Sequence, residues 1–227
     1  MDTIIAGFTS GLIQTLLGHP YDTLKTWHQN ASILKMPPLK FKNLYKGISY
    51  SLIKTPLLFS ATFYSNYYIK QKTNNVQISS LATGLISSII TTPLHKYKVI
   101  KQQNLKYDLN LTNILYSYKK MHIIMLREIP AKFIYFSTFD KFKQYNIPVF
   151  LSGAISGTLS WSITYPCDTI KSRILSGKCK TIKEAYLKKD LFKGLQPCLV
   201  RAFIVNGMVI YIYEKVLEMK IYTNLVK

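Results

Sequence analysis

The chain has 227 residues, of which 48% are hydrophobic, and it carries a formal net charge of +20. A soluble protein this basic usually binds nucleic acid. Here, however, three stretches lack any Asp, Glu, Lys or Arg, over residues 3–21, 73–95 and 144–167. Uncharged apolar runs of this length are candidates for membrane spans. They disfavour the nucleic-acid-binding class and predict a basic integral membrane protein.

Six long helices are predicted in chain order, over residues 3–30, 47–70, 76–104, 120–143, 148–176 and 194–218. The first, third and fifth carry small residues four positions apart, a pattern that lets transmembrane helices approach closely. No basic segment precedes the first apolar run, so no cleavable signal peptide is expected. The three cysteines follow no metal or disulfide spacing. No catalytic triad, carboxylate pair or phosphate loop is recognisable, so neither an enzyme nor a metal site is expected.

Three prolines, Pro20, Pro93 and Pro166, recur at equal intervals of 73 residues (93 − 20 and 166 − 93). Each lies toward the end of a predicted helix, where proline removes one backbone hydrogen bond and bends the axis. So long a period indicates copies of a larger module rather than a solenoid of small repeats. We expect three repeats, over residues 1–73, 74–146 and 147–227, which together form one structural domain.

The residues after each proline repeat as well. The three copies read Pro20-Tyr21-Asp22-Thr23-Leu24-Lys25, Pro93-Leu94-His95-Lys96-Tyr97-Lys98 and Pro166-Cys167-Asp168-Thr169-Ile170-Lys171. This pattern resembles the signature of the mitochondrial carrier family, Pro-x-[Asp/Glu]-x-x-[Lys/Arg]-x-[Lys/Arg], whose last position is Trp27, Ile100 and Arg173 in the three copies. Three copies in phase cover nearly the whole chain. The family fold implied is an all-α membrane protein with six transmembrane helices in three pseudo-threefold repeats around a central cavity, with short matrix-side helices.

The resemblance implies transport by alternating access, with salt bridges closing the cavity on its matrix side. Its cyclic pairing predicts that Asp22 meets Lys98 and that Asp168 meets Lys25. His95 replaces the acid that would face Lys171, so one bridge is missing. Gln29 and Gln102 occupy the positions of the glutamine braces beneath the bridges.

On the other side of the membrane the family uses [Phe/Tyr]-[Asp/Glu]-x-x-[Lys/Arg] at the ends of its even-numbered helices. The copies here retain two acids and two bases, which are Lys70, Asp140, Lys143 and Glu214. At most two cytoplasmic bridges can form. With both gates short of a full set of bridges, we expect a carrier that interconverts readily and is not very stable in detergent.

Lys54, Arg127 and Arg201 align with the three substrate contact points of the family, and Glu128 and Lys132 lie beside the second. Arginine presents a planar fork that suits phosphate and carboxylate groups. The surplus of positive charge favours an anionic substrate, foremost a ribo- or deoxyribonucleotide taken up by exchange. The Arg127-Glu128 pair is instead similar to the second contact point of amino-acid carriers. An amino acid or keto acid is therefore the alternative substrate.

Lysines crowd the three long loops within the repeats. The positive-inside rule then places these loops in the matrix and both termini on the intermembrane-space side of the inner membrane. Basic helix starts on the matrix side favour cardiolipin as a bound lipid; no other cofactor is expected. We expect a monomer, compact for the family, whose lysine-rich composition is consistent with a reduced or viral genome and hence a host mitochondrion.

Overall fold

The computed structural model describes residues 2–30, 44–45, 48–102, 115–175, 179–188, 190–192 and 194–225. Within these ranges the side chains of residues 24–30, 95–102, 120 and 220–225 are not described. The secondary structure of the described residues is helical throughout, which confirms the predicted all-α fold.

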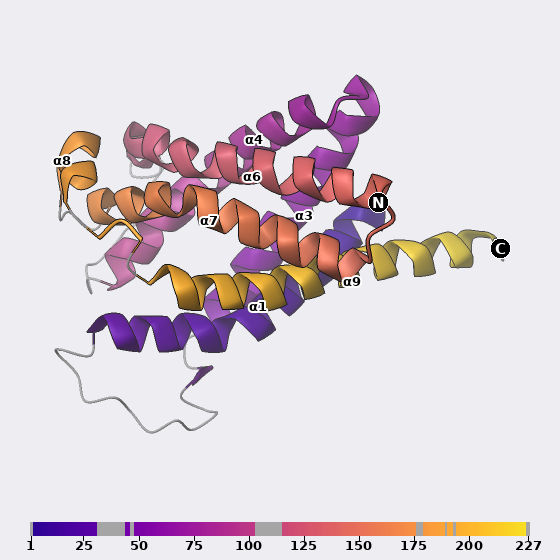
Figure 1. Cartoon of the computed structure of the whole chain (residues 1–227), viewed down its shortest axis with the longest axis horizontal. Coiled ribbons are helices and arrows are strands. Elements are labelled where there is room, and N and C mark those ends of the chain that lie inside the picture. The colour runs from indigo at the N-terminus through magenta and orange to yellow at the C-terminus, as the bar shows by residue number, and fades with distance from the viewer. Residues whose placement is uncertain are drawn as a thin grey trace. The chain divides into compact units, whose positions relative to one another are not determined.

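Six long helices match the predicted ranges to within a few residues, except that the last one extends to Leu225 instead of ending at residue 218. They are α1 (Asp2–Asn30), α3 (Ile48–Thr73), α4 (Val76–Gln102), α6 (Met121–Gln144), α7 (Val149–Leu175) and α9 (Leu195–Leu225). A short helix, α8 (Ile182–Leu187), separates α7 from α9, and a single 3-10 turn, η1 (Tyr118–Lys120), precedes α6 (Figure 1). Pro20, Pro93 and Pro166 all lie inside their helices as predicted.

The helices are unusually rich in serine and threonine. In α4, for example, Thr83, Ser88 and Thr92 each donate a hydrogen bond to the carbonyl four residues earlier. Such bonds satisfy the hydroxyl group within its own helix, so that it can be buried away from water. The many serine and threonine residues also lower the mean hydropathy of the helices. Among the described residues, only the segment Leu195–Met219 is long and apolar enough by itself to qualify as a membrane span.

The chain divides into two compact units. Unit 1 comprises Met1–Tyr64, Lys141–Thr158 and Gln196–Lys227, and unit 2 comprises Ser65–Asp140 and Leu159–Leu195. The division passes through α3, α6 and α7. The three predicted repeats stay a prediction.

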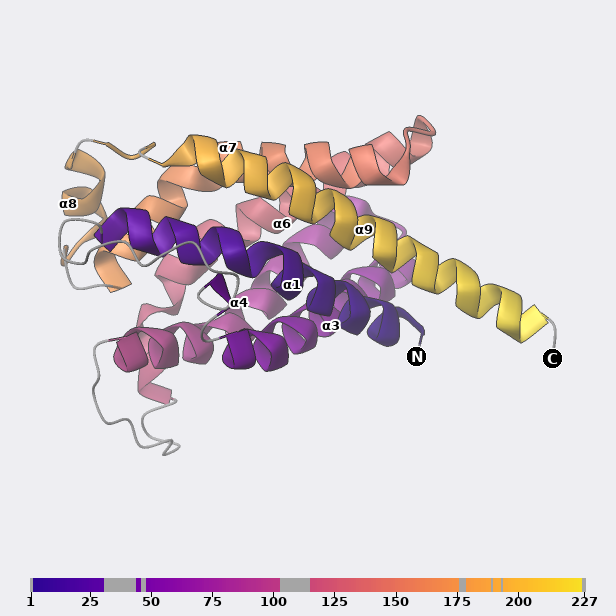
Figure 2. The ribbon, with the colours of Figure 1, turned by 90° about the horizontal axis from the view of Figure 1, so that it is seen from below.

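In unit 1, glycines bring helix backbones into close contact. A β-carbon added to Gly11 of α1 would lie 2.5 Å from the Cα atom of Pro56 on α3. One added to Gly157 of α7 would lie 2.4 Å from the Asn206 side chain on α9. A larger residue at either position would force two helices apart. The amino-terminal half of α9 lies beside α1 in both ribbon views (Figures 1 and 2).

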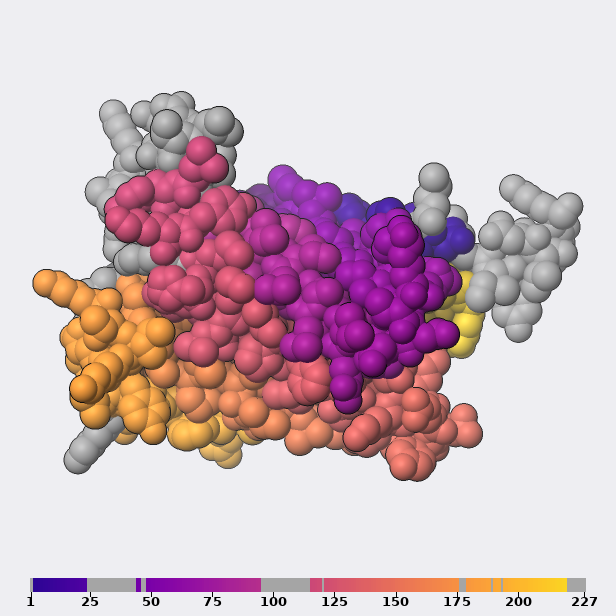
Figure 3. Space-filling view, turned by 90° about the horizontal axis from the view of Figure 1, so that it is seen from above, coloured from indigo at the N-terminus to yellow at the C-terminus, as the bar shows by residue number. Residues whose placement is uncertain are grey.

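In unit 2, α4 and α6 pack together in the same way. A β-carbon at Gly84 would lie 2.7 Å from the Cα atom of Ile129. The hydroxyl of Tyr118 donates to the carbonyl of Ile89, 3.2 Å away. The space-filling view shows the side chains of α4 and of the start of α6 in direct contact on this face (Figure 3). The close packing of small residues therefore positions α6, which carries the candidate substrate residues.

The short helix α8 lies beside the end of α7 in unit 2 (Figure 1). Its Ala185 is fully buried and packs with Ile123, Ile170, Ile174 and Cys179 in one apolar cluster. The hydroxyl of Thr181 caps its first turn by accepting a hydrogen bond from the backbone N–H of Glu184. This is a short helix between two long ones, as the resemblance predicted; its two counterparts would fall outside the described residues.

Candidate functional site

Arg127 lies at the centre of a charged cluster in unit 2. It is on the second turn of α6, and its guanidinium is 2.5 Å from the carboxylate of Glu128 and 3.6 Å from that of Asp168 on α7. The same guanidinium lies over the ring of Trp161, 4.7 Å from the ring centre. Cation–π stacking and two carboxylates fix the plane of the arginine fork. Arg127 is therefore held in place by α6 and α7 together.

Two lysines complete this cluster. Lys171 is buried one turn after Asp168 and lies 3.4 Å from its carboxylate. Glu128 is only 5% exposed, and it feels the charges of Lys171 and Lys132 as well as that of Arg127. A buried carboxylate is stable only when cations or hydrogen-bond donors surround it. The cluster thus interleaves three cations with two acids.

Arg201 forms the corresponding contact in unit 1. It lies on α9, and its Nη2 atom is 3.0 Å from an oxygen of Asp22 on α1. Gly18 lies one turn before Asp22, and a β-carbon there would be 2.9 Å from the same Nη2 atom. The absence of a side chain at Gly18 lets the guanidinium lie against α1. The Nε atom of Arg201 is buried and has no hydrogen-bond partner among the described residues.

Lys54, the third predicted substrate contact, lies on α3 in unit 1. Its ammonium group is 6.0 Å from the ring centre of Tyr50, one turn earlier on the same helix. This is the outer limit for a cation–π contact. The three predicted contact residues therefore differ: two are arginines with an acidic partner from another helix, and the third is a lysine near an aromatic ring.

The predicted matrix gate is described only in part. The side chains of Lys25, Gln29, His95, Lys98 and Gln102 lie outside the described residues. The predicted pairs of Asp22 with Lys98 and of Asp168 with Lys25 consequently stay predictions. The described acids have other contacts: Asp22 binds Arg201, and Asp168 lies between Arg127 and Lys171.

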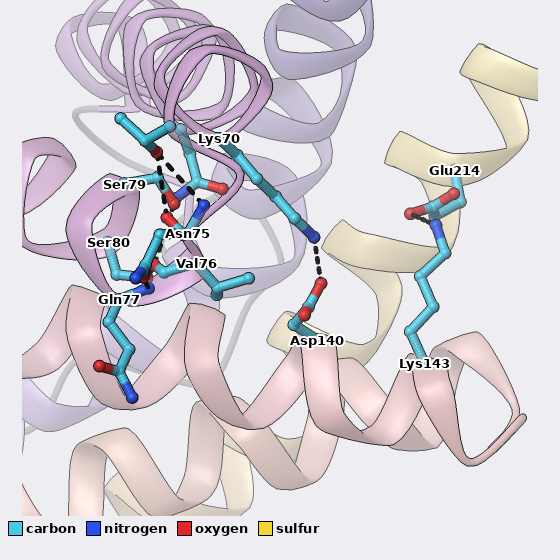
Figure 4. A network of polar contacts seen from close by, with 11 residues as sticks. Lys70, Asn75, Val76, Gln77, Ser79, Ser80, Asp140, Lys143 and Glu214 are labelled. Atoms are coloured by element: carbon cyan, nitrogen blue, oxygen red, sulfur yellow. Dashed lines mark hydrogen bonds and ion pairs between the residues drawn. The ribbon is translucent and has the colours of Figure 1, made fainter.

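The predicted cytoplasmic residues occur as two pairs. In unit 2, Lys70 near the end of α3 is paired with Asp140 on α6. In unit 1, Lys143 is 2.8 Å from Glu214 on α9. Figure 4 shows the side chains of each pair pointing toward one another. Both bridges that the sequence permits are therefore present.

Three contributors were not predicted. Gly18 makes room for Arg201, and Trp161 stacks on Arg127. Arg173, the third arginine of the chain, binds the backbone carbonyls of Ala185 and Lys188, each at 2.9 Å. A signal for Gly18 exists in the repeat, because the positions 73 and 146 residues later are threonines rather than glycines. Arg173 also has a signal, because it occupies the last basic position of the carrier signature, whereas Trp161 has none.

Residues 145–223 match the mitochondrial carrier protein family. Protein S of the mitochondrial substrate carrier family in Dictyostelium discoideum is 27% identical, with 95% of this chain and 96% of that protein aligned. A mitochondrial arginine transporter of Arabidopsis thaliana is 26% identical over 94% and 90%. Mitochondrial ornithine transporter 1 of Rattus norvegicus is 25% identical over 93% and 92%.

The family match over residues 145–223 and these relatives, which align with most of the chain, support membership of the mitochondrial carrier family. Its members are transporters of small metabolites rather than enzymes, and the relatives of this chain are proteins of the mitochondrial inner membrane. The resemblance recognised from the three proline motifs is confirmed.

Proposed function

We propose that this carrier exchanges a small amphoteric metabolite, one that carries both a carboxylate and a cationic group, across the inner membrane by alternating access. Amino acids are the foremost members of this class. Glu128 carries the proposal, because a buried carboxylate beside Arg127 would repel a purely anionic substrate. The same carboxylate would attract a substrate ammonium group while a nearby cation binds the substrate carboxylate.

The charge balance within unit 2 supports this substrate class. Arg127, Lys132 and Lys171 bring three positive charges, and Glu128 and Asp168 offset two of them. A triphosphate would be better served by an uncompensated surplus. The relatives named for arginine, ornithine and carnitine point in the same direction.

A nucleotide is the second candidate. The observation in its favour is the number of cations at the three predicted contact points, to which Lys54 and Arg201 of unit 1 contribute two. Of these two, Arg201 already contacts Asp22. Both candidate substrates have an anionic group, so binding to an arginine side chain of the carrier does not distinguish them. Only the amphoteric candidate also has a cationic group, and this group distinguishes the two.

Exchange in proteoliposomes distinguishes the two. Purified carrier is reconstituted with internal ornithine, arginine, carnitine, 2-oxoglutarate, ADP or dATP, and uptake of each labelled compound is measured against unloaded vesicles. We expect uptake of an amphoteric compound that depends on an internal partner. Glu128→Gln is expected to abolish it, while Glu218→Gln, an acid-to-amide change on the exposed part of α9, leaves it intact. Uptake of ADP or dATP without uptake of any amphoteric compound would refute the proposal.

We further propose the predicted topology, with both termini in the intermembrane space and α8 on the matrix side. Protease treatment of intact mitoplasts tests the topology through an epitope at either terminus. Loss of both epitopes is expected, and protection of either one would contradict it.

Cardiolipin remains the proposed lipid partner. Gly194, which precedes α9, has a φ angle of +85°, a conformation that favours glycine, and the helix start that follows it is a type of site at which anions bind. Native mass spectrometry of carrier extracted from cardiolipin-containing membranes would count the bound lipids. Retention of no cardiolipin would contradict the proposal.

A further inference from the structure

The two arginines of the proposed substrate contacts share one arrangement that the gate model does not explain. Each lies against the aspartate of a proline motif on another helix: Arg127 of α6 against Asp168 of α7, and Arg201 of α9 against Asp22 of α1. Arg201 follows Arg127 by 74 residues (201 − 127), and Asp168 follows Asp22 by 146 (168 − 22). The two contacts are therefore equivalent under the repeat, each joining an even-numbered helix of the bundle to the next odd-numbered one in cyclic order.

At the third pair of equivalent positions, Lys54 and His95, the sequence lacks both the arginine and the aspartate. Asp168 comes 41 residues after Arg127 (168 − 127), and the residue 41 positions after Lys54 is His95 (95 − 54). Where an aspartate is present, the even-numbered helix has an arginine; where the aspartate is replaced, it has a lysine. This correspondence links the arginines to the aspartates as well as to a substrate.

We propose that Asp22 and Asp168 are positioning residues of the substrate site, an inference that rests on the proposed function. They act as provisional counter-ions of Arg201 and Arg127, and either one is displaced when the carboxylate of an incoming substrate binds its arginine. The displaced aspartate then becomes available for a matrix-side bridge. In this way the same two acids connect substrate binding with gate closure.

The geometry makes the aspartates easy to displace. An oxygen of Asp22 lies 3.0 Å from the Nη2 atom of Arg201, and the buried Nε atom of that arginine has no hydrogen-bond partner among the described residues. Asp168 is 3.6 Å from Arg127, beyond a good hydrogen bond. A carboxylate that accepts two parallel hydrogen bonds from a guanidinium binds more strongly than one that accepts a single bond. A bidentate substrate therefore has the advantage over either aspartate.

Gly18 has a part in the same arrangement. A β-carbon at this position would lie 2.9 Å from Arg201 Nη2, so alanine would push the guanidinium away from α1 while leaving Asp22 unchanged. The neighbour here is the end of a flexible side chain, which can move without disturbing the helix. Gly18 is thus a positioning residue that can be tested separately from the acid.

A thermal double-mutant cycle tests the pair without relying on transport. Wild type, Asp22→Asn, Arg201→Gln and the double variant are purified in detergent, and their unfolding is compared with and without L-ornithine at a saturating concentration. We expect a non-additive loss of stability without ornithine and additive behaviour with it. Additivity without ornithine would overturn the proposal. If coupling is present but ornithine is neither bound nor transported, the positioning role stands and the proposed substrate fails.

Transport kinetics separate this role from a purely structural or gate role. Asp22→Asn is expected to lower KM about two- to fivefold, because the competing carboxylate is gone, and also to lower the maximal rate. A residue that served only the gate would lower the rate and leave KM unchanged. Asp22→Glu is expected to restore both values in part. Gly18→Ala is expected to change KM with the acid intact, and Glu218→Gln serves as the matched control; an unchanged KM in both Asp22→Asn and Gly18→Ala would refute displacement.

Discussion

The ammonium nitrogen of Lys143, in the last turn of α6, lies 2.8 Å from a carboxylate oxygen of Glu214 on α9. The pair of Lys70 with Asp140 links α3 to the same helix α6 (Figure 4). The lysine side chains are 57% and 43% exposed, so water screens both pairs. Such pairs are suited to a gate, because they can be broken in every cycle at little cost.

Glu214→Gln and Asp140→Asn are each expected to lower the free energy of unfolding by about 0.2–1 kcal/mol. Because the two pairs share no residue, the double variant is expected to show the sum of the two losses. Thermal unfolding in one detergent measures this, with Glu218→Gln as the control for an exposed acid. A loss well above the sum would mean that the two pairs act as one network.

Close packing at glycine gives a second prediction. Gly11→Ala would place a methyl group 2.5 Å from the Pro56 Cα atom, and backbone atoms cannot move aside as a side chain can. We expect a loss of about 1–3 kcal/mol and poor recovery from membranes. Gly18→Ala is the matched control, because its new methyl group meets only the end of Arg201. Equal recovery of the two variants would contradict this distinction.

The positions of the helices could be predicted from the sequence because the repeat and the uncharged runs are local patterns. The pairing of Arg201 with Asp22 could not, since these residues lie at opposite ends of the chain and the family resemblance directs Asp22 to Lys98. The role of Trp161 could not be predicted either, because its stacking on Arg127 depends on how α6 and α7 pack. A sequence identifies which residues repeat, whereas their partners depend on tertiary packing.

Arg173 supports a prediction about α8. Its guanidinium binds the carbonyls at the end of this helix, and a third carbonyl, that of Asp190, lies 3.4 Å away. Lysine has one nitrogen and cannot reproduce this fork. Arg173→Lys is expected to cost about 1–3 kcal/mol of local stability, measured as faster amide hydrogen exchange over residues 182–187. Unchanged exchange in this segment would show that the apolar cluster around Ala185 suffices.

The start of α8 is expected to depend on pH. The pKa of Glu184 is lowered because its carboxylate accepts a hydrogen bond from the backbone N–H of Lys180 and lies near Lys188. A lowered pKa in the folded state means that the charged form stabilises α8 at neutral pH. This contribution is lost as the pH falls below the ordinary glutamate value of about 4.3 and through the lower folded value. The rate of amide hydrogen exchange at α8, corrected for intrinsic rates, is expected to rise as the pH falls through that range. Glu184→Gln is expected to remove this pH dependence. Identical pH profiles of wild type and Glu184→Gln would contradict the prediction.

His95→Asp tests the missing acid of the second repeat. Position 95 corresponds to Asp22 and Asp168 under the 73-residue period, so the substitution would supply the acid needed for a third matrix bridge. Under the repeat, it would also give Lys54 the acidic counterpart that Arg127 and Arg201 have in Asp168 and Asp22. Each added pair stabilises the closed gate and must be broken before the gate reopens. We therefore expect a higher unfolding temperature and a slower exchange rate.

His122→Asp introduces the same charge at an exposed position of α6 and serves as the control. If His95→Asp matched wild type in both stability and rate, the gate would not be limited by the number of its bridges, and the substitution of histidine would have no bearing on transport.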